Sequence, residues 1–319
     1  MNVTEAELLS AIRRLLDEPA PDVIVGVGDD AAVVRGGSGD LVLTTDAMVQ
    51  DRHFELGSTA PRDLGAKAIA ASVSDVAAMA ASPRFALCAL TLSDRVDAAW
   101  TMELFGGIRE ASEDYAVRLV GGNLSKADTV SVTVTVSGEV APGRAVTRAG
   151  ARPGDVVAVT GSLGGAAAGL RLGRRRGGWS DLELAAIRRH VRPTARVGEA
   201  AVLARHGVTA MIDLSDGLGA DLARLCEASE VGASLRLDDL PVDAVATREE
   251  ALAGGEDYEL LATLPSIGAV ASAGDELLET FGVAFTAIGT VAEGGTIVAE
   301  GSDGREQALG PLGWDHFRA

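Results

Sequence analysis

The sequence has few lysine, histidine, cysteine and aromatic residues. The scarcity of lysine and histidine excludes several familiar kinds of active site. Lys67 and Lys126 are the only lysines among 28 basic residues, and neither follows a glycine-rich loop. The chain therefore has no Walker A motif and no protein-kinase lysine. Four histidines occur without H-x-x-x-H or Cys/His zinc spacing, and no G-x-S-x-G elbow is present. These absences exclude P-loop, protein-kinase, zinc-site and serine-hydrolase motifs.

Cysteine and long apolar runs are also scarce. Cys88 and Cys226 lie in apolar stretches with no C-x-x-C pattern, which predicts buried thiols in a reducing compartment. The N-terminal segment lacks a signal-peptide pattern, and no run of 18 apolar residues is free of charge. We therefore expect a cytoplasmic protein without a membrane-spanning helix.

Acidic residues are plentiful. The chain has 46 Asp and Glu against 28 Lys and Arg, a formal charge of −18. This balance argues against nucleic acid and anionic membranes as partners, because both are bound by basic surfaces. With 319 residues and 47% hydrophobic content, the chain is long and apolar enough for globular domains, and two are expected.

Strand and helix patterns alternate along the chain, which predicts an α/β or α+β fold. Residues 141–155 are rich in Gly, Pro and Arg and mark the boundary between domains 1–145 and 146–319. Helices are expected at 61–82, 97–117, 166–173, 181–190, 196–205 and 217–229, and strands at 85–92, 129–140, 156–160 and 208–213.

The first acidic motif, residues 26–31, imitates the dinucleotide fingerprint G-x-G-x-x-A. We reject that interpretation because residues 31–35 continue as a strand, whereas the fingerprint requires a helix. Asp29 and Asp30 would also repel a pyrophosphate. The two acids suit a cation, or simply form an acidic turn.

Further acids stand where they could bind a hard cation. Thr44, Thr45 and Asp46 end an apolar strand, and hydroxyl and carboxylate oxygens suit Mg²⁺. Asp75 lies in a helix that is apolar on nearly every face, where an unpaired carboxylate is costly. The structural alternative for Thr44, Thr45 and Asp46 is an ordinary cap at the end of a strand. The alternative for Asp75 is a partly exposed helix residue.

Three later motifs are each open to two interpretations. Asp213, Ser215 and Asp216 lie on a turn that opens a helix, where they could hold a metal bridging to phosphate or cap the helix. Glu256 and Asp257 follow two glycines and could form a ligand rim or a solvated turn. The glycine-rich turn 161–165 could bind an anion or aid packing.

Taken together, these motifs resemble the thiamine-monophosphate kinase family in order and spacing. The resemblance spans residues 26–317 and rests on nine segments: VGDDAAVV, TTDAMVQDRHF, DLGAKAIAASVSDVAAMAASP, GGN, GRAVTRAGARPGD, VTGSLGGAAAGL, IDLSDGL, GGEDYEL and GWDHF. The family is part of a wider ATP-binding group that includes aminoimidazole ribonucleotide synthetase and selenophosphate synthetase.

The resemblance implies a fold and a division of labour. An N-terminal α/β domain would bind ATP and Mg²⁺ and contribute strands to a barrel shared by a homodimer, and a C-terminal α/β domain would close the site. The family pattern implies Mg²⁺ ligands at Asp30, Thr44, Thr45, Asp46, Asp75, Asn123, Asp213 and Asp216. It implies thiamine monophosphate contacts at His53, Glu256 and Trp314, and ATP contacts at Gly122, Asn123, Arg148 and Ser215.

The implied reaction is transfer of the ATP γ-phosphoryl group to thiamine monophosphate, giving thiamine diphosphate and ADP. Several Mg²⁺ ions and in-line geometry would suffice, without a catalytic side chain. Asn123 departs from the family pattern, which has Asp there, so we expect one weaker metal position. Another ATP-dependent reaction of the wider group and a non-catalytic Mg²⁺- or nucleotide-binding role are the alternatives.

Overall fold

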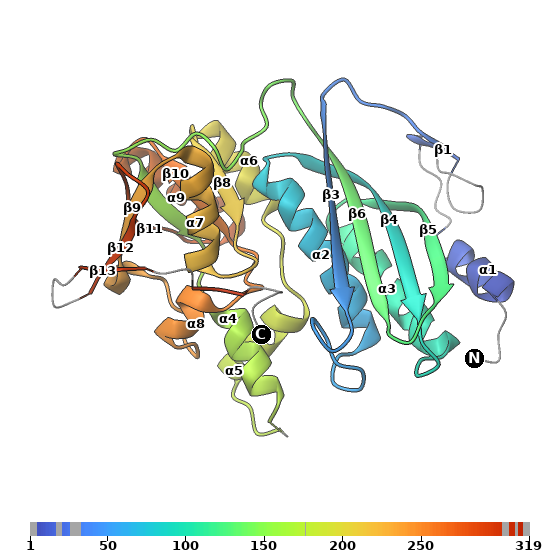
Figure 1. The fold of residues 1–319 in the computed structure, drawn as a ribbon. Helices are drawn as coiled ribbons and strands as arrows, with labels where there is room; N and C mark the ends of the chain where they lie inside the picture. The colour runs from blue at the N-terminus through green and yellow to red at the C-terminus, as the bar shows by residue number, and fades with distance from the viewer. Residues whose placement is uncertain are drawn as a thin grey trace. The chain divides into compact units, whose positions relative to one another are not determined.

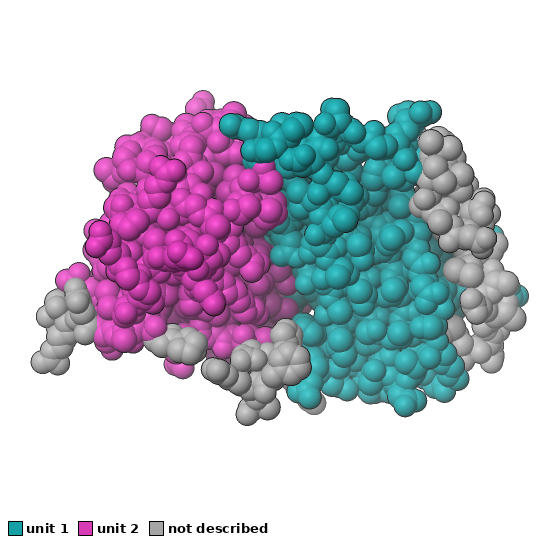
Figure 2. All heavy atoms as spheres, turned by 45° about the horizontal axis from the view of Figure 1, so that its top comes forward, with its two compact units in different colours: residues 1–76, 81–144 teal, residues 77–80, 145–319 magenta. Residues whose placement is uncertain are grey.

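The chain folds into two compact units, shown in different colours in Figure 2. Unit 1 comprises residues 1–76 and 81–144, and unit 2 comprises residues 77–80 and 145–319. The computed structural model describes residues 5–16, 21–25, 33–175, 177–301, 306–309 and 312–314. Figure 1 shows a sheet with helices in each unit, which confirms the predicted two-domain α/β class.

Unit 1 is built on a four-stranded sheet in the order β3-β6-β4-β5. β6 pairs antiparallel with both β3 and β4, and β4 pairs parallel with β5. Val132, Val134 and Val136 of β6 are fully buried, and the residues between them face the other side. The predicted strand at 129–140 is thus confirmed, because strict alternation gives the sheet one buried face. The strands are β3 (Asp40–Val49), β4 (Ser82–Leu92), β5 (Arg118–Lys126) and β6 (Ser131–Val140).

Helices α2 (Pro61–Ala78) and α3 (Ala98–Asp114) pack closely in unit 1. A Cβ added to Gly65 of α2 would lie 2.1 Å from the Leu104 carbonyl oxygen of α3, so glycine is required at this crossing. Asp97 caps α3 by accepting a hydrogen bond from the Trp100 N–H. Helix α1 (Glu5–Leu16) and the short strands β1 (Val23–Val25) and β2 (Val33–Val34) complete the described elements of this unit.

The other face of this sheet carries exposed apolar side chains. Leu41 and Leu43 of β3 are 64% and 65% exposed, and Leu87 of β4 is 44% exposed. Thr45 lies on the same face as Leu41 and Leu43, because these three residues occupy alternate positions along β3. The two faces of β3 therefore differ in what they can contribute to a site.

Unit 2 contains a mostly antiparallel sheet in the order β13-β12-β9-β11-β7-β10-β8. Its strands are β7 (Val156–Thr160), β8 (Ala210–Asp213), β9 (Gly232–Arg236), β10 (Leu260–Leu264), β11 (Phe285–Ala292), β12 (Ile297–Glu300) and β13 (Glu306–Ala308). Its helices are α4 (Gly165–Gly173), α5 (Asp181–Val191), α6 (Val197–Arg205), α7 (Leu218–Ser229), α8 (Arg248–Ala253) and α9 (Ile267–Phe281), with a 3₁₀ turn η1 (Leu237–Asp239).

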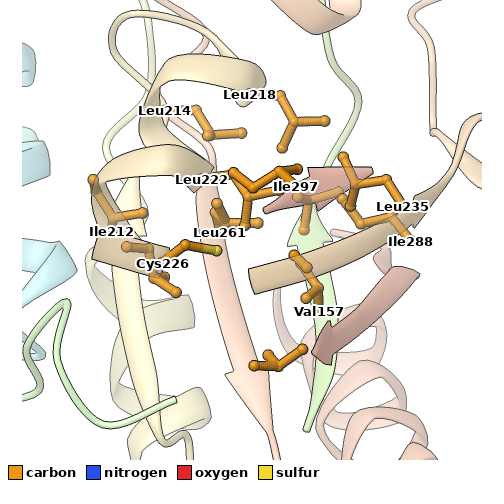
Figure 3. Close-up of a cluster of buried hydrophobic side chains, with 14 of the residues drawn as sticks. Val157, Ile212, Leu214, Leu218, Leu222, Cys226, Leu235, Leu261, Ile288 and Ile297 are labelled. Carbon is orange, nitrogen blue, oxygen red and sulfur yellow. The ribbon is translucent and has the colours of Figure 1, made fainter. Parts of the chain in front are cut away.

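Alternate residues of the unit 2 strands point to opposite faces of the sheet and pack into two separate hydrophobic cores. Val157 and Ile212 pack with Leu222 of α7 in the cluster of Figure 3. Ala158 and Met211 enter a second cluster with residues of α6 and α9. Helices therefore cover both faces of the central strands, which explains why those strands are apolar almost throughout.

Both cysteines are buried free thiols, as predicted. Burial raises the pKa of Cys88 to about 12 and that of Cys226 to about 11, so both remain protonated and unreactive near neutral pH. Among the described residues, no helix combines the length and apolar character needed to cross a membrane.

Candidate functional site

Strand β3 brings Thr44 and Asp46 to the face of the unit 1 sheet that helix α2 covers. The Thr44 hydroxyl donates a hydrogen bond of 2.5 Å to the Asp75 carboxylate of α2. Asp75 is partly exposed, unlike the fully buried Ser72 and Ser74 before it. The structure thus joins two of the predicted metal-binding residues directly and places a third on the same side of β3.

Two other predicted metal-binding side chains of unit 1 lie on the opposite face. The Thr45 hydroxyl lies 3.0 Å from the Thr135 hydroxyl of β6. Asn123 of β5 is in register with Ala89 of β4, which shares its face with Leu87. Because neighbouring residues in register project to the same face of a sheet, Asn123 points away from the side that carries Asp46.

Gly122 is needed by the strand pairing itself. A Cβ at this position would lie 1.9 Å from the carbonyl oxygen of Cys88 on β4. His53 follows β3, and its Nδ1 atom accepts a hydrogen bond of 3.1 Å from the Val49 N–H. Since an accepting nitrogen carries no proton, the neutral ring is protonated at Nε2.

In unit 2, Asp213 ends strand β8 and is buried beside Leu260 of β10. Ser215 and Asp216 follow it on the turn that leads into α7. The Ser215 carbonyl accepts a hydrogen bond of 2.8 Å from the Glu256 N–H, and the Asp216 carbonyl accepts one of 2.9 Å from the Trp314 N–H. The structure therefore brings together three sequence motifs that lie about a hundred residues apart at the extremes.

Glu256 and Trp314 differ in how they are held. Glu256 has a positive φ of 68°, and its Oε2 atom lies 3.2 Å from Nδ1 of His190 on α5. Trp314 is 52% exposed, so much of its ring faces solvent. A large exposed aromatic ring beside two carboxylate-bearing turns is suited to stacking on a ligand.

Arg148 is not joined to these residues by any hydrogen bond or ion pair among the described contacts. It is exposed, and its carbonyl oxygen accepts a hydrogen bond of 2.8 Å from the Ser229 hydroxyl. The adjacent Thr147 carbonyl accepts from the Met211 N–H, which places this segment beside β8.

The glycine-rich turn 161–165 already holds an anion from within the protein. The Asp257 carboxylate accepts hydrogen bonds from the N–H groups of Gly164 (2.6 Å) and Ala166 (3.0 Å), at the start of α4. Burial raises the pKa of Asp257 to about 7, although these two N–H groups act to lower it. Of the two interpretations left open by the sequence, packing is therefore favoured over ligand binding.

Asp221 and Arg224 of α7 are residues that the sequence motifs did not single out. Asp221 is fully buried, and its Oδ2 atom accepts N–H groups of Ser215, Asp216 and Gly217. Burial raises its pKa to about 6. Only a weak signal was available, because α7 carries Arg224 and Glu227 besides Asp221 and is not as apolar as the part of α2 around Asp75. His190 offered no comparable signal, since its partner Glu256 is 66 residues away.

Asp30 and the rest of the motif at residues 26–31 lie outside the described residues. In the part of the chain that is described, no group of three His, Cys, Asp or Glu side chains is placed to hold a metal ion. A cage made of acids alone is therefore not preassembled within either unit's described residues.

Two family models match the chain. The N-terminal domain of AIR synthase related protein matches residues 28–140, and the C-terminal domain of AIR synthase related protein matches residues 152–301. Together they cover most of the sequence; the first lies in unit 1 apart from residues 77–80, and the second lies in unit 2.

Named relatives narrow the family. The thiamine-monophosphate kinase of Escherichia coli is 39% identical over 311 residues, or 93% of each chain. The structure of thiamine-monophosphate kinase from Stenotrophomonas maltophilia has a TM-score of 0.83 at 32% identity and covers 96% of this chain and 98% of its own. That of AaThiL, complexed with AMPPCP and TMP, has a TM-score of 0.77 at 34% identity over 99% of each chain. With nearly full-length identity above 30%, the chain belongs to the thiamine-monophosphate kinase family.

Proposed function

We propose that the chain transfers the γ-phosphoryl group of ATP to the phosphate of thiamine monophosphate, giving ADP and thiamine diphosphate. The observation that carries this proposal is the hydrogen-bonded assembly of Ser215, Asp216, Glu256 and Trp314. The resemblance assigns these residues to nucleotide, metal and thiamine monophosphate. A relative that is 34% identical over 99% of the chain has been crystallised with AMPPCP and TMP, which supports the same pair of substrates.

The reaction needs charge neutralisation more than acid–base catalysis. The acceptor is a phosphate oxygen, and a phosphate second pKa is about 6, so the nucleophile is already anionic near neutral pH. The obstacle is repulsion between two polyanions. Direct in-line attack on the γ-phosphorus would then require positioning and positive charge, without a covalent enzyme intermediate.

The donor atoms fit Mg²⁺, which prefers oxygen ligands and usually completes its shell with substrate phosphates and water. Bound ions would neutralise phosphate charge during transfer. We assign the side chains of Thr44, Asp46 and Asp75 in unit 1, and of Asp213 and Asp216 in unit 2, together with Asp30. Thr45 would act through its backbone carbonyl, because its side chain faces the other side of β3.

The substrate contacts follow from the available hydrogen-bonding groups. His53 would donate from Nε2 to a phosphate oxygen, since Nδ1 is occupied by the Val49 N–H. Glu256 would accept from the amino group of the thiamine pyrimidine, and Trp314 would stack on one of its rings. Gly122, Asn123, Arg148 and Ser215 remain our proposed ATP contacts, with Arg148 supplying a fixed positive charge. We do not retain Asn123 as an Mg²⁺ ligand, because its side chain faces away from the side that carries Asp46.

We further propose a homodimer formed through the unit 1 sheet. Leu41, Leu43 and Leu87 expose apolar surface on one face, as an interface core requires. A Leu43→Glu variant should sediment as a monomer while the wild type sediments as a dimer. In this proposal residues 1–145 form the dimer contact and supply part of the ATP and Mg²⁺ ligands, and residues 146–319 supply the remaining ligands and close the site. The buried free thiols are consistent with a cytoplasmic enzyme.

A coupled assay of ADP release tests the activity. Thiamine monophosphate should stimulate release strongly in the presence of Mg²⁺, and thiamine, which lacks the acceptor phosphate, should not. Chelation of Mg²⁺ should abolish the signal. If neither thiamine monophosphate nor thiamine stimulates any ADP release, although the protein binds ATP, the non-catalytic alternative is favoured. Release with a different phosphorylated or amidine acceptor alone would favour another reaction of the wider ATP-binding group.

A further inference from the structure

One carboxylate oxygen of unit 2 gathers three consecutive backbone groups. Oδ2 of Asp221 lies 3.1, 3.0 and 3.1 Å from the backbone nitrogens of Ser215, Asp216 and Gly217, respectively, each of which donates to it. Asp221 is fully buried in the first turn of α7. Three donors at one buried acceptor fix the orientation of three successive peptide planes.

The carbonyl groups of the same peptides point the opposite way, because a trans peptide places its C=O and N–H on opposite sides of a rigid plane. The Leu214 carbonyl accepts from the Tyr258 N–H at 2.9 Å, that of Ser215 from Glu256 at 2.8 Å, and that of Asp216 from Trp314 at 2.9 Å. Each peptide that donates to Asp221 therefore also accepts from a segment that carries Glu256 or Trp314.

We propose that Asp221 is the positioning residue of the unit 2 part of the site. Through three peptide planes it sets the places of Ser215, Asp216, Glu256 and Trp314 relative to one another. Asp221 would not contact a substrate and would act only through these neighbours. Its effect on catalysis rests on the proposed function, whereas its effect on the turn does not.

Arg224 extends the same arrangement to a side chain. One of its guanidinium nitrogens lies 2.5 Å from Oδ1 of Asp221, and the other lies 2.6 Å from Oδ2 of Asp216. The arginine thus compensates two carboxylates and holds that of Asp216 beside the turn. Oδ2 of Asp221 thus accepts hydrogen bonds from the backbone, and Oδ1 accepts one from Arg224.

An Asp221→Asn variant separates positioning from simple helix stability. The amide keeps the size of the side chain, but its NH₂ group must face either the three N–H groups or Arg224, which are all donors. The matched control is Leu225→Ala, which removes a fully buried side chain one turn further along α7 and leaves the turn's hydrogen bonds in place. Both variants should destabilise α7, Leu225→Ala through lost packing and Asp221→Asn through lost hydrogen bonds, and only Asp221→Asn removes the acceptor of the turn.

We expect kcat/KM for thiamine monophosphate to fall about 100-fold in Asp221→Asn, with KM raised and kcat lowered, since misplacement of about 1 Å has effects of this size. Leu225→Ala should keep both constants close to wild type at temperatures well below its unfolding midpoint. The proposal is overturned if kcat/KM falls no further in Asp221→Asn than in the control.

Hydrogen–deuterium exchange gives a readout that does not require activity. In the full-length wild-type chain, the amides of residues 215–217 should exchange as slowly as those inside α7. In Asp221→Asn they should exchange about tenfold faster relative to α7 or more, because their acceptor is lost. In Leu225→Ala, the exchange rates of the turn and of the helix should rise by the same factor, because the turn keeps its hydrogen bonds.

The wild-type measurement decides the matter even if Asp221→Asn does not fold, because rapid exchange at residues 215–217 in the native chain overturns the proposal. The two hypotheses also fail separately. If the wild type does not phosphorylate thiamine monophosphate, the proposed function is wrong, and the exchange data still show whether Asp221 organises the turn.

Discussion

The two units hold their candidate residues in different ways. In unit 1, Thr44, Asp46 and Asp75 lie on a regular strand and a regular helix, and a direct side-chain hydrogen bond links two of them. In unit 2, Ser215, Asp216, Glu256 and Trp314 lie on loops joined by backbone hydrogen bonds. A side chain on a regular element can be replaced without moving its neighbours, whereas the loop residues depend on one another for their positions.

In unit 1, removal of one charged side chain should lower activity strongly with little effect on stability. Asp46→Asn should lower turnover on the order of 10²- to 10³-fold, the usual range for losing one electrostatic contact to a transferring group. Its thermal midpoint should stay close to wild type, because β3 keeps all its pairing with β6. Steady-state kinetics and thermal unfolding at saturating Mg²⁺ measure the two effects.

Asp94→Asn is the matched control for this variant, since Asp94 is an exposed acid of unit 1 paired with Lys126. It should change neither quantity. A well-folded Asp46→Asn protein with near-normal turnover would remove Asp46 from the metal site.

Unit 2 should instead couple charge to stability, most clearly at Asp257. Its folded-state pKa is raised to about 7 from 3.8, chiefly by burial, with Glu259 raising it and Arg189 lowering it. The folded state then binds more protons than the unfolded state in this window. The free energy of unfolding should therefore decrease as pH rises from about 4 to about 7, by up to roughly 1.4 kcal/mol per pH unit.

Asp257→Asn should lose this part of the slope, and urea unfolding of both proteins at several pH values between 4 and 8 measures it. Asp221, whose pKa is raised to about 6, still contributes in the variant below that pH. The clearest contrast is thus expected between pH 6 and 7. Equal slopes in that interval would contradict a buried, proton-binding Asp257.

Adjacent threonines on β3 test the separation of the two sheet faces. Thr44→Val removes the donor to Asp75 and should lower kcat/KM roughly fivefold, as expected for a hydrogen bond of about 1 kcal/mol. Thr45→Val changes only the opposite face and should stay within about twofold of wild type. If the two variants lost activity equally, the placement of the site on the α2 side of β3 would be wrong.

The smallest effect is expected at His190, which supports Glu256 from α5 at 3.2 Å. His190→Phe keeps a ring but removes the nitrogen that faces the carboxylate. KM for thiamine monophosphate should rise about threefold with kcat unchanged, consistent with the loss of one polar contact to Glu256. A fall in kcat without a change in KM would assign His190 a different role.

Much of this architecture could be predicted from the sequence because it is periodic. Alternation in residues 129–140 predicted β6, and a helical pattern that starts at Pro61 and is apolar on nearly every face around Asp75 predicted α2. Strand alternation also places the side chains of Thr44 and Thr45 on opposite faces of β3, so a metal on the Asp46 side can be reached only by the side chain of Thr44.

The arrangement of the unit 2 loops could not be predicted from any local sequence pattern. The hydrogen bonds from Glu256 to Ser215 and from Trp314 to Asp216 join residues 41 and 98 positions apart, and they depend on how β8, β10 and α7 pack. The sequence places Asp257 in an acidic segment after two glycines, but nothing local shows that its carboxylate lies against Gly164 and Ala166. Contacts of this kind require the tertiary fold.

The most direct test of the proposed reaction is a ³¹P NMR spectrum of the full-length protein incubated with Mg²⁺, ATP and thiamine monophosphate. We expect equal amounts of ADP and thiamine diphosphate, with the thiamine monophosphate resonance decreasing in step. Inorganic phosphate formed in step with ADP, with thiamine monophosphate unchanged, would contradict it, and so would formation of AMP.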